Sequence, residues 1–408
     1  MSTILHDART TEGTRVDVVV EGTRVQAIVE AGRAAATAAD TVHDLAGMLL
    51  LSAAAEPHAH LDKAFTADLV DNPTGDLLGA IVAWGAHRAQ LTVDDIAQRA
   101  EAAARLSLAH GITAIRTHVD LGADIGLLGI EALCQVRDRL RPLMHIEVVC
   151  LVAPALRGWT SADQQALLRD ALAIGADTVG GAPFLDDAPT PAIARLIDAA
   201  VDHGAAIDLH TDETLDVSVL TLRDYARLVE QAGLQGRAAA SHCVSLGMQP
   251  EHVQREVAEL CASAGVSVIA LPQTNLFLQA RGLRTGPPRG LTAIATLRDA
   301  GVNVAGGADN LQDPFNTVGR ADPMETAALL IMAGHLPAEV AYEFVSNSSR
   351  RVMGLEQVGL FVGSTADFIA IDAPTLRGAV ATASPTRVVF HEGRLVARTS
   401  ATTTFTDL

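Results

Sequence analysis

Eight short apolar runs, each followed by a helix-like stretch, lie between residues 48 and 310 and constrain the fold more than any other feature. The runs are apolar and β-branched without polar alternation, which is typical of strands buried on both faces of a sheet. The stretches between them show the 3.6-residue periodicity of helices, as in Val93–Ala109, Ser161–Ile174 and Pro250–Ala264. Eight strand–helix repeats predict an α/β fold, the (β/α)8 or TIM barrel. The predicted strands are Met48–Ala55, Ile112–Thr117, His145–Val152, Thr178–Pro183, Ala206–Leu209, Ala238–Ser241, Ser267–Pro272 and Asn303–Gly307.

The two ends of the chain have a different pattern. Residues 15–52 and 356–400 contain short strand-like runs separated by turn residues. Because both ends of such a barrel lie on its N-terminal face, we expect them to meet and build one small β-sandwich. The predicted domains are residues 1–52 plus 355–408 for the sandwich and residues 53–354 for the catalytic barrel.

Charge and composition exclude several partners. The 408 residues include 30 basic and 48 acidic side chains, a net charge of −18 that repels phosphate backbones and excludes nucleic acid. The longest nearly apolar run, residues 46–55, is far shorter than the roughly 18 residues of a membrane helix, so no membrane partner is expected. Four cysteines without CxxC spacing, and an N-terminus unlike a signal peptide, predict a cytoplasmic protein. A homo-oligomer is compatible with the sequence, which does not set the number of subunits.

Histidine and aspartate follow four of the predicted strands, at the end of the barrel where active sites form. His58 and His60 are two residues apart on an extended segment, so both imidazoles face the same side. His210, His242 and Asp309 follow the fifth, sixth and eighth strands. An isolated HxH pair is a weak signal, but ligand-type residues at four strand ends are hard to explain by packing alone. The sequence therefore indicates a metal centre at this rim.

Several segments that keep their order along the chain resemble one enzyme family. The sequence resembles the amidohydrolase superfamily and, within it, the cytosine deaminase branch, which includes N-isopropylammelide amidohydrolase-type enzymes. The matching segments are residues 56–66, 116–120, 175–181, 210–213, 240–242, 275–281 with Arg289 and Gly290, 308–315 and 359–372.

The resemblance implies a mononuclear metal centre. His58, His60, His210 and Asp309 would bind one divalent ion, Zn²⁺ or Fe²⁺, and leave a position for water, whose pKa falls to about 7 on such a metal. Some superfamily members hold two metals bridged by a lysine after the fourth strand. Here that strand ends in glycines, and Lys63 after the first strand is the only lysine in the sequence, so a lysine-bridged pair of metals is not expected.

The resemblance also implies catalytic roles. Glu213 would act as the proton shuttle that protonates a ring nitrogen and helps to expel the amine. His242 would hydrogen-bond the attacking water, and Asp309 would accept its proton as well as bind metal. The competing interpretation of Glu213 is an ordinary solvated acid in a loop that also contains Asp212 and Asp216.

Recognition of the substrate is less defined. In cytosine deaminase a glutamine on the third strand reads the pyrimidine edge, whereas this chain has Cys150-Leu-Val-Ala-Pro154 there. Loss of that polar group argues against cytosine itself, since sites built to pair with a polar edge discriminate strongly. His118 and Asp120, after the second strand, are expected to orient ligands rather than react. The candidate substrate-binding residues are Phe315, Asn310, Gln273, Asn275 and Gln279.

The leading hypothesis is a hydrolase of C–N bonds other than peptide bonds. It would deaminate a small nitrogen heterocycle, such as a pyrimidine, a triazine or a related ring, with water activated on the metal. One alternative is hydrolysis of a cyclic amide at the same site, against which the missing bridging lysine counts. A second alternative is a non-catalytic barrel that only binds a small ligand, although such a protein has no need for a water-activating site.

Overall fold

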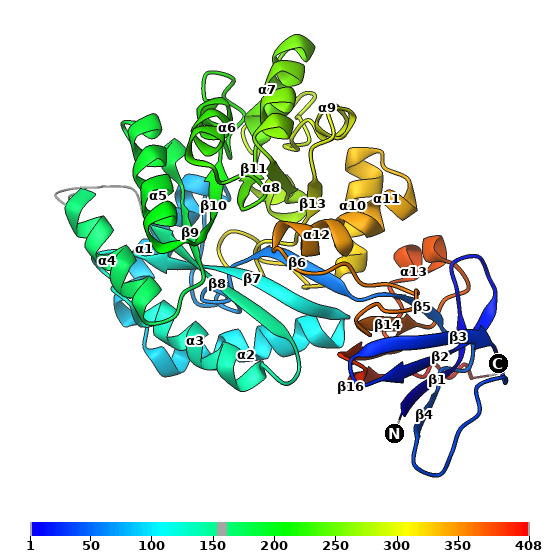
Figure 1. Cartoon of the computed structure of the whole chain (residues 1–408). Coiled ribbons are helices and arrows are strands. Elements are labelled where there is room, and N and C mark those ends of the chain that lie inside the picture. Colours follow the sequence, from blue (N-terminus) through cyan, green and yellow to red (C-terminus); the bar gives the residue numbers. More distant parts are fainter. Residues whose placement is uncertain (1, 153–160, 407–408) are drawn as a thin grey trace.

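The computed structural model describes residues 2–152 and 161–406, which form a barrel and a separate sheet beside it (Figure 1). Eight parallel strands pair in chain order to make the barrel wall, which confirms the predicted TIM barrel. These strands are β6 (Ala54–Ala59), β7 (Ile112–Leu121), β8 (His145–Val152), β9 (Thr178–Gly181), β10 (Ala206–Thr211), β11 (Ala238–His242), β12 (Val266–Ala270) and β13 (Val304–Gly306).

The barrel closes between its first and last strands. Ala59 in β6 forms a parallel bridge with Asp309, just beyond β13. The amide of Asp309 donates to the carbonyl of His58 over 3.1 Å, and the amide of His60 donates to the carbonyl of Asp309 over 3.2 Å. The closing seam therefore holds three of the predicted metal ligands against one another.

Helices cover the outside of the barrel (Figure 1). In α2, Thr92 caps the first turn by accepting the amide of Asp95 over 3.2 Å, and Ile96 and Leu108 are among the residues that the helix buries. The helices between the strands and after the last one are α2 (Val93–Ala109), α3 (Leu128–Leu140), α4 (Ser161–Ala173), α5 (Pro189–His203), α6 (Thr221–Ala232), α7 (Glu251–Ser263), α9 (Ile294–Asp299), α10 (Pro323–Gly334), α11 (Ala338–Phe344) and α12 (Asn347–Val352).

Shorter helices lie in the segments that follow the carboxyl ends of strands. They are α1 (Leu77–His87), η1 (Arg88–Gln90), η2 (Pro183–Leu185), η3 (Val244–Met248) and α8 (Pro272–Leu278). Of these elements, α1, η1 and η2 contribute residues to the cavity at the open end of the barrel.

Both termini build the second sheet, as predicted. Its strand order is β16-β15-β14-β5-β1-β2-β3, with β4 paired to β1. Side chains from both ends of the chain, including Val18, Leu50, Phe368 and Phe390, share one buried core against this sheet. The strands are β1 (Ser2–Arg9), β2 (Arg15–Glu21), β3 (Arg24–Glu30), β4 (Thr41–Asp44), β5 (Leu49–Ser52), β14 (Phe368–Ile371), β15 (Arg387–His391) and β16 (Arg394–Thr399), and α13 (Leu376–Thr382) joins β14 to β15.

The structure differs from the predicted strands at several positions, of which three affect the fold most. The predicted strand Met48–Ala55 is two strands, because β5 pairs with β14 in the terminal sheet while β6 begins the barrel. Both halves are almost fully buried, so apolar composition alone conceals the change of sheet. Strand β7 continues to Leu121 rather than ending at Thr117, and Ser2–Arg9 is a strand that the sequence pattern did not indicate.

Two further features concern the cysteines and the length of the helices. All four cysteines are buried and free of disulfides. Within residues 2–152 and 161–406, no helix combines the length and the apolar character that crossing a membrane requires.

Candidate metal centre and active site

Four imidazoles and one carboxylate converge at the closing seam of the barrel. Nε2 of His60 lies 3.1 Å from Nε2 of His210 and 3.3 Å from Oδ1 of Asp309. Nε2 of His58 lies 3.6 Å from the same Oδ1, and Nε2 of His242 lies 3.8 Å from Oδ2 of Asp309. All five side chains are buried. The structure thus brings together every residue predicted to bind metal.

The unsatisfied atoms in this cluster fit a divalent cation. Nε2 of His58 and both carboxylate oxygens of Asp309 are buried and have no hydrogen-bond partner in the described part of the chain. Buried polar atoms are rarely left without a partner in folded proteins. One nitrogen each from His58, His60 and His210 can be chosen within 4.8 Å of one another, so a single ion among them would satisfy these atoms together.

Burial also keeps two of these imidazoles in the form that binds metal. Loss of contact with water lowers the pKa of His58 and of His210 well below the ordinary range, and the neighbouring imidazoles lower both further. Neutral imidazole is the ligand form of histidine.

A chain of buried hydrogen bonds fixes the orientation of His58. Its Nδ1 lies 2.8 Å from Oγ of Ser241, whose hydroxyl donates to Oδ1 of Asp208 over 2.9 Å. Arg116 donates to the other oxygen of Asp208 over 2.9 Å and to Glu147 through two further bonds of 3.0 Å. Because the hydroxyl proton goes to Asp208, Nδ1 of His58 must be the donor to Ser241, which leaves the lone pair on Nε2 toward the cluster.

Glu213 and His242 lie next to the cluster. Oε1 of Glu213 is 3.6 Å from Nδ1 of His242, and Asn275 accepts from the same nitrogen over 3.0 Å. Glu213 is 5% exposed, so the interpretation as an ordinary solvated loop acid is wrong for its position. Burial raises the pKa of Glu213 well above its ordinary value, and the nearby Asp309 raises it further.

The chain turns sharply where these residues leave their strands. Asp212, His242, Cys243 and Asp309 all have positive φ angles, of 51°, 70°, 48° and 67°. Residues other than glycine adopt this conformation at an energetic cost, and such strain gathers at functional sites. The unusual backbone therefore marks the same rim as the ligand cluster.

The single lysine lies behind His60. Nζ of Lys63 is 3.3 Å from Nδ1 of His60, 2.7 Å from Asp120 and 3.3 Å from Asp62. Burial alone would lower the pKa of Lys63, but the two carboxylates more than offset this and raise it. Asp120 also accepts the indole N–H of Trp84 over 2.7 Å. The lysine is thus held by two acids beside the cluster.

A cavity with about 860 Å³ of empty space, part of it open to solvent, ends at the cluster. Volumes of this order are usual for small-molecule sites. His60, His210, Asp309, His242 and Glu213 lie at one end of it. Its walls are mostly apolar and are formed by Leu77, Ile81, Trp84, Leu151, Val152, Phe184, Leu185 and Phe315. The shape and lining suit a planar, largely apolar ring that presents a few polar atoms to the cluster.

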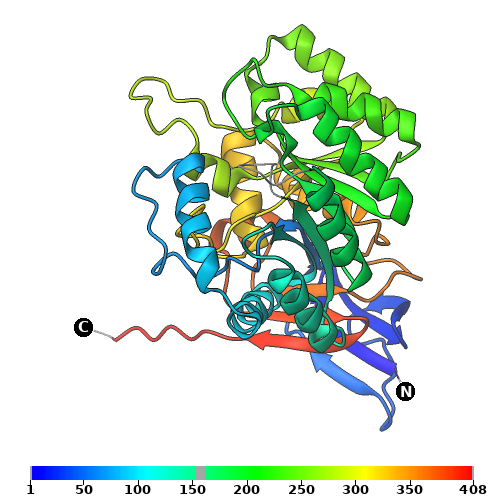
Figure 2. The ribbon, with the colours of Figure 1, turned by 90° about the vertical axis from the view of Figure 1, so that its left-hand side faces the viewer.

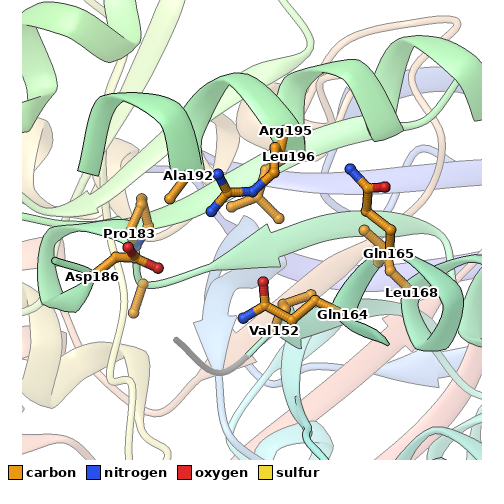
Figure 3. A pocket seen from close by; sticks show the side chains of 10 residues that line it. Val152, Gln164, Gln165, Leu168, Pro183, Asp186, Ala192, Arg195 and Leu196 are labelled. Atoms are coloured by element: carbon orange, nitrogen blue, oxygen red, sulfur yellow. The ribbon is translucent and has the colours of Figure 1, made fainter. Parts of the chain in front are cut away.

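A second hollow, of about 440 Å³, lies between α4 and α5 (Figure 3). Gln164, Leu168 and Arg195 are among the residues that line it, and no described residue in its lining is a histidine or a cysteine. It therefore lacks the ligand chemistry of the barrel rim.

The five predicted substrate contacts fall in different places. Phe315 and Asn310 line the cavity. Asn275 lies behind His242 and contacts that imidazole, while Gln279 donates to the carbonyl of Glu213 over 3.2 Å. Gln273 donates to Thr326 over 2.7 Å and does not line the cavity.

The third strand contributes apolar atoms where cytosine deaminase has its glutamine. Leu151 and Val152 line the cavity, and Cys150 is buried. Ala153 and Pro154, which complete the segment compared above, lie outside the described residues.

Sequence reasoning missed the polar groups beneath the cluster. Arg116, Asp208 and Ser241 had no assigned role, although each is a neighbour of a ligand-type residue on its own strand. Arg116 and Asp208 precede His118 and His210 by two residues, and alternation in a strand predicts that they face the same side. His118 packs against His58, with ring centroids 3.9 Å apart and ring planes tilted by 31°, and neither of its nitrogens has a hydrogen-bond partner in the described part of the chain.

A closed parallel barrel with this cluster and cavity at the carboxyl ends of its strands has the architecture of a metal-dependent hydrolase. The family model described as "Amidohydrolase family" matches residues 68–397. The chain belongs to the amidohydrolase family, as the sequence segments had indicated.

Individual relatives place it in a deaminase-like branch. It is 32% identical over 391 residues to pterin deaminase of Rhizobium rhizogenes (strain K84 / ATCC BAA-868), a match that covers 94% of this chain and 88% of the relative. The structure of 5-methylcytosine deaminase from Klebsiella pneumoniae liganded with 5-fluorocytosine superposes with a TM-score of 0.89 at 25% identity, covering 100% of this chain and 99% of that chain.

N-isopropylammelide isopropylaminohydrolase from Burkholderia multivorans ATCC 17616 superposes with a TM-score of 0.84 at 28% identity, covering 98% of this chain and 99% of that chain. These relatives are deaminases and amidohydrolases. The chain is accordingly an enzyme that hydrolyses C–N bonds.

Proposed function

We propose that the chain catalyses the hydrolytic deamination of an amino-substituted nitrogen heterocycle. The observation that carries this proposal is the position of Glu213 and His242, which line an apolar cavity beside the ligand cluster. A site that only bound a ligand would need neither the cluster nor a buried acid next to it. The relatives named above support the same reaction class.

His58, His60, His210 and Asp309 would hold one divalent ion, Zn²⁺ or Fe²⁺. An ion held by three imidazoles and a carboxylate lowers the pKa of a water molecule to about 7 and so supplies a nucleophile at neutral pH. Relative affinities do not choose between iron and zinc in such a site. The buried hydrogen bonds that link Arg116, Asp208 and Ser241 hold His58 in the tautomer that this arrangement requires.

The residues beside the cluster move the protons. Water attacks the sp² ring carbon that carries the amine, and Asp309 takes a proton from that water. Glu213 gives a proton to the adjacent ring nitrogen and then relays the hydroxyl proton of the tetrahedral intermediate to the amine, which leaves as ammonia as the carbonyl forms. The proton held by Asp309 then returns to Glu213. His242, whose Nδ1–H donates to Asn275, has a free Nε2 that would accept a hydrogen bond from the hydroxyl of the attacking water or of the tetrahedral intermediate.

Pteridines are the first substrates that we would test. Pterin is the substrate named for the relative at 32% identity. Phe315 offers a flat aromatic wall and Asn310 a polar group, and both line the cavity. Leu151 and Val152 provide no hydrogen bond to a pyrimidine edge, which counts against cytosine.

Release of ammonia from a panel of pterins, pyrimidines, triazines and purines tests the proposal directly. Glu213→Gln should keep its metal and lose about 100-fold or more in kcat, since a positioned proton donor contributes this much. Asp216→Asn changes an exposed acid in the same loop and is the matched control, which should keep full activity.

Three results would contradict the proposal. Normal turnover by Glu213→Gln would show that Glu213 is not the proton shuttle. Ring opening of lactams without any release of ammonia favours cyclic amide hydrolysis instead. A folded, metal-free protein that binds heterocycles and turns over none of them is a ligand-binding barrel.

A further inference from the structure

The active-site cavity continues into an outer groove. This outer groove, with about 910 Å³ of empty space, is distinct from the hollow between α4 and α5. It shares lining residues with the active-site cavity, among them Phe184, Leu185 and Glu213. Glu213 thus lies where the two spaces meet. A substrate ring at the cluster can therefore carry a substituent that extends past Phe184 and Leu185 into the groove.

One wall of the groove is a cationic loop. Residues 279–290 include Arg281, Arg284 and Arg289 and no acidic residue, in a chain whose net charge is −18. Figure 2 shows this loop (yellow-green) projecting on the same side of the barrel as α1 (blue). The local charge is thus opposite to that of the protein as a whole.

Arg281 is the arginine of this loop that lines the groove. Its Cζ lies 4.4 Å from the centre of the Phe277 ring. On the other side it packs over Gly75, where a Cβ atom would lie only 3.1 Å from that Cζ. The guanidinium is therefore held between the loop and the turn that precedes α1, and a side chain at position 75 would displace it.

Packing alone positions this guanidinium. In the part of the chain that the structure describes, Arg281 makes no hydrogen bond and no ion pair, whereas Arg289 donates to the carbonyl of Ala333 and contacts His335 over 2.9 Å. A guanidinium has five N–H donors in a fork that matches a carboxylate. Those of Arg281 remain available to a ligand in the groove.

The nearest acid does not neutralise Arg281 by direct contact. Asp76 also lines the groove, but its carboxylate caps α1 by accepting the amide of Gly79 over 2.8 Å and the hydroxyl of Thr74 over 2.9 Å. No ion pair within 4.0 Å joins Asp76 to Arg281 among the described residues. One cationic group with free donors therefore faces the groove.

We propose that the outer groove is a subsite for a carboxylate carried on the substrate ring, and that Arg281 binds it. A guanidinium whose N–H donors are all free of direct hydrogen bonds matches the charge and the planar shape of one carboxylate. The inference rests on the proposed deamination, because it requires the ring to lie at the cluster. It adds to that function a preference for anionic over neutral heterocycles.

Matched pterins test the subsite. Kinetics would compare pterin-6-carboxylate with 6-hydroxymethylpterin, a neutral compound of similar size. The ratio of kcat/KM for the carboxylate to that for the neutral compound should fall roughly tenfold to hundredfold in Arg281→Met, mainly through KM, since the contact is made equally in the ground and transition states. Arg284→Met, which removes a charge from the same loop outside the groove lining, should keep the wild-type ratio.

Calorimetric binding of pterin-6-carboxylate separates this inference from the proposed function. Binding that weakens in Arg281→Met, without release of ammonia, supports the subsite and contradicts deamination. Turnover of both pterins with the same ratio in the wild type and in Arg281→Met overturns the subsite and leaves deamination standing. An equal fall of the ratio in Arg284→Met also overturns it, because general loop charge would then explain the preference.

Discussion

Replacing Ser241 by alanine should loosen the metal centre without touching a ligand. The hydroxyl is fully buried and links Nδ1 of His58 at 2.8 Å to Oδ1 of Asp208 at 2.9 Å. Burial alone would raise the pKa of Asp208, but the facing His118 and Arg116 more than offset this and lower it, so the carboxylate is ionised at neutral pH.

The expected cost follows from these contacts. Ser241→Ala removes one hydrogen bond to an ionised carboxylate and leaves a buried imidazole N–H without an acceptor, each worth about 1–3 kcal/mol. We expect the free energy of unfolding of the metal-free protein to fall by about 2–4 kcal/mol. Loss of such outer-shell partners lowers metal affinity about 10- to 100-fold, which corresponds to about 1.4–2.8 kcal/mol.

Two measurements separate the effects. Urea unfolding of the metal-free protein reports stability, and competition with a chelator reports metal affinity. Ser267→Ala is the matched control, because Ser267 lies on the next strand of the barrel and accepts a hydrogen bond from Asn303 over 3.1 Å, away from the ligands. It should leave metal affinity unchanged. A folded Ser241→Ala protein that holds metal as tightly as the wild type would refute the orienting role of the buried chain.

Three further predictions concern buried charged groups and buried thiols. Arg116→Met leaves the buried carboxylates of Glu147 and Asp208 without their cation and should lower the free energy of unfolding by about 3–5 kcal/mol; a loss below about 1 kcal/mol in urea would contradict the pairing. Burial alone would raise the pKa of Asp367, but its contacts with His391 and Arg350 lower it. Asp367 therefore adds stability above an unfolded-state pKa of about 3.9, and this stability is lost as the pH falls through the lower folded-state pKa. The Asp367→Asn protein should accordingly lose less stability in acid than the wild type. An unchanged dependence of stability on pH would contradict this prediction. Burial raises the pKa of all four cysteine thiols. A thiol reagent at pH 8 should therefore react with none of them in the native protein and with all four after unfolding. Rapid labelling of the native protein would contradict this prediction, because it would show that a thiol is accessible.

The sequence predicts that the ligand-type side chains lie close together, because the information for this is local. His58 and His60 are two residues apart on one strand, and alternation alone places both imidazoles on one side. The order of the barrel strands then predicts that His210 and Asp309 reach the same rim. Neither inference requires knowledge of a contact between residues that are far apart in the sequence.

The parts that the sequence could not predict depend on packing between distant segments. The break at Ala53 separates two sheets, yet the residues on both sides of it are equally apolar, so composition does not reveal it. Ser241 binds His58 across 183 positions of sequence, and serine has no distinctive pattern in a buried strand. Arg281, which lines the outer groove, packs over Gly75, a contact between two loops that no periodicity encodes.

The metal content of the purified protein tests the central claim most directly. Elemental analysis of the wild type should find about one zinc or iron ion per chain, and His210→Ala should lose it together with release of ammonia. His203→Ala changes an exposed histidine at the end of α5 and should retain both. One equivalent of metal added to the metal-free wild type should restore turnover. Deamination by a protein that contains almost no metal, or full metal content in His210→Ala, would contradict a single-ion centre built by these residues.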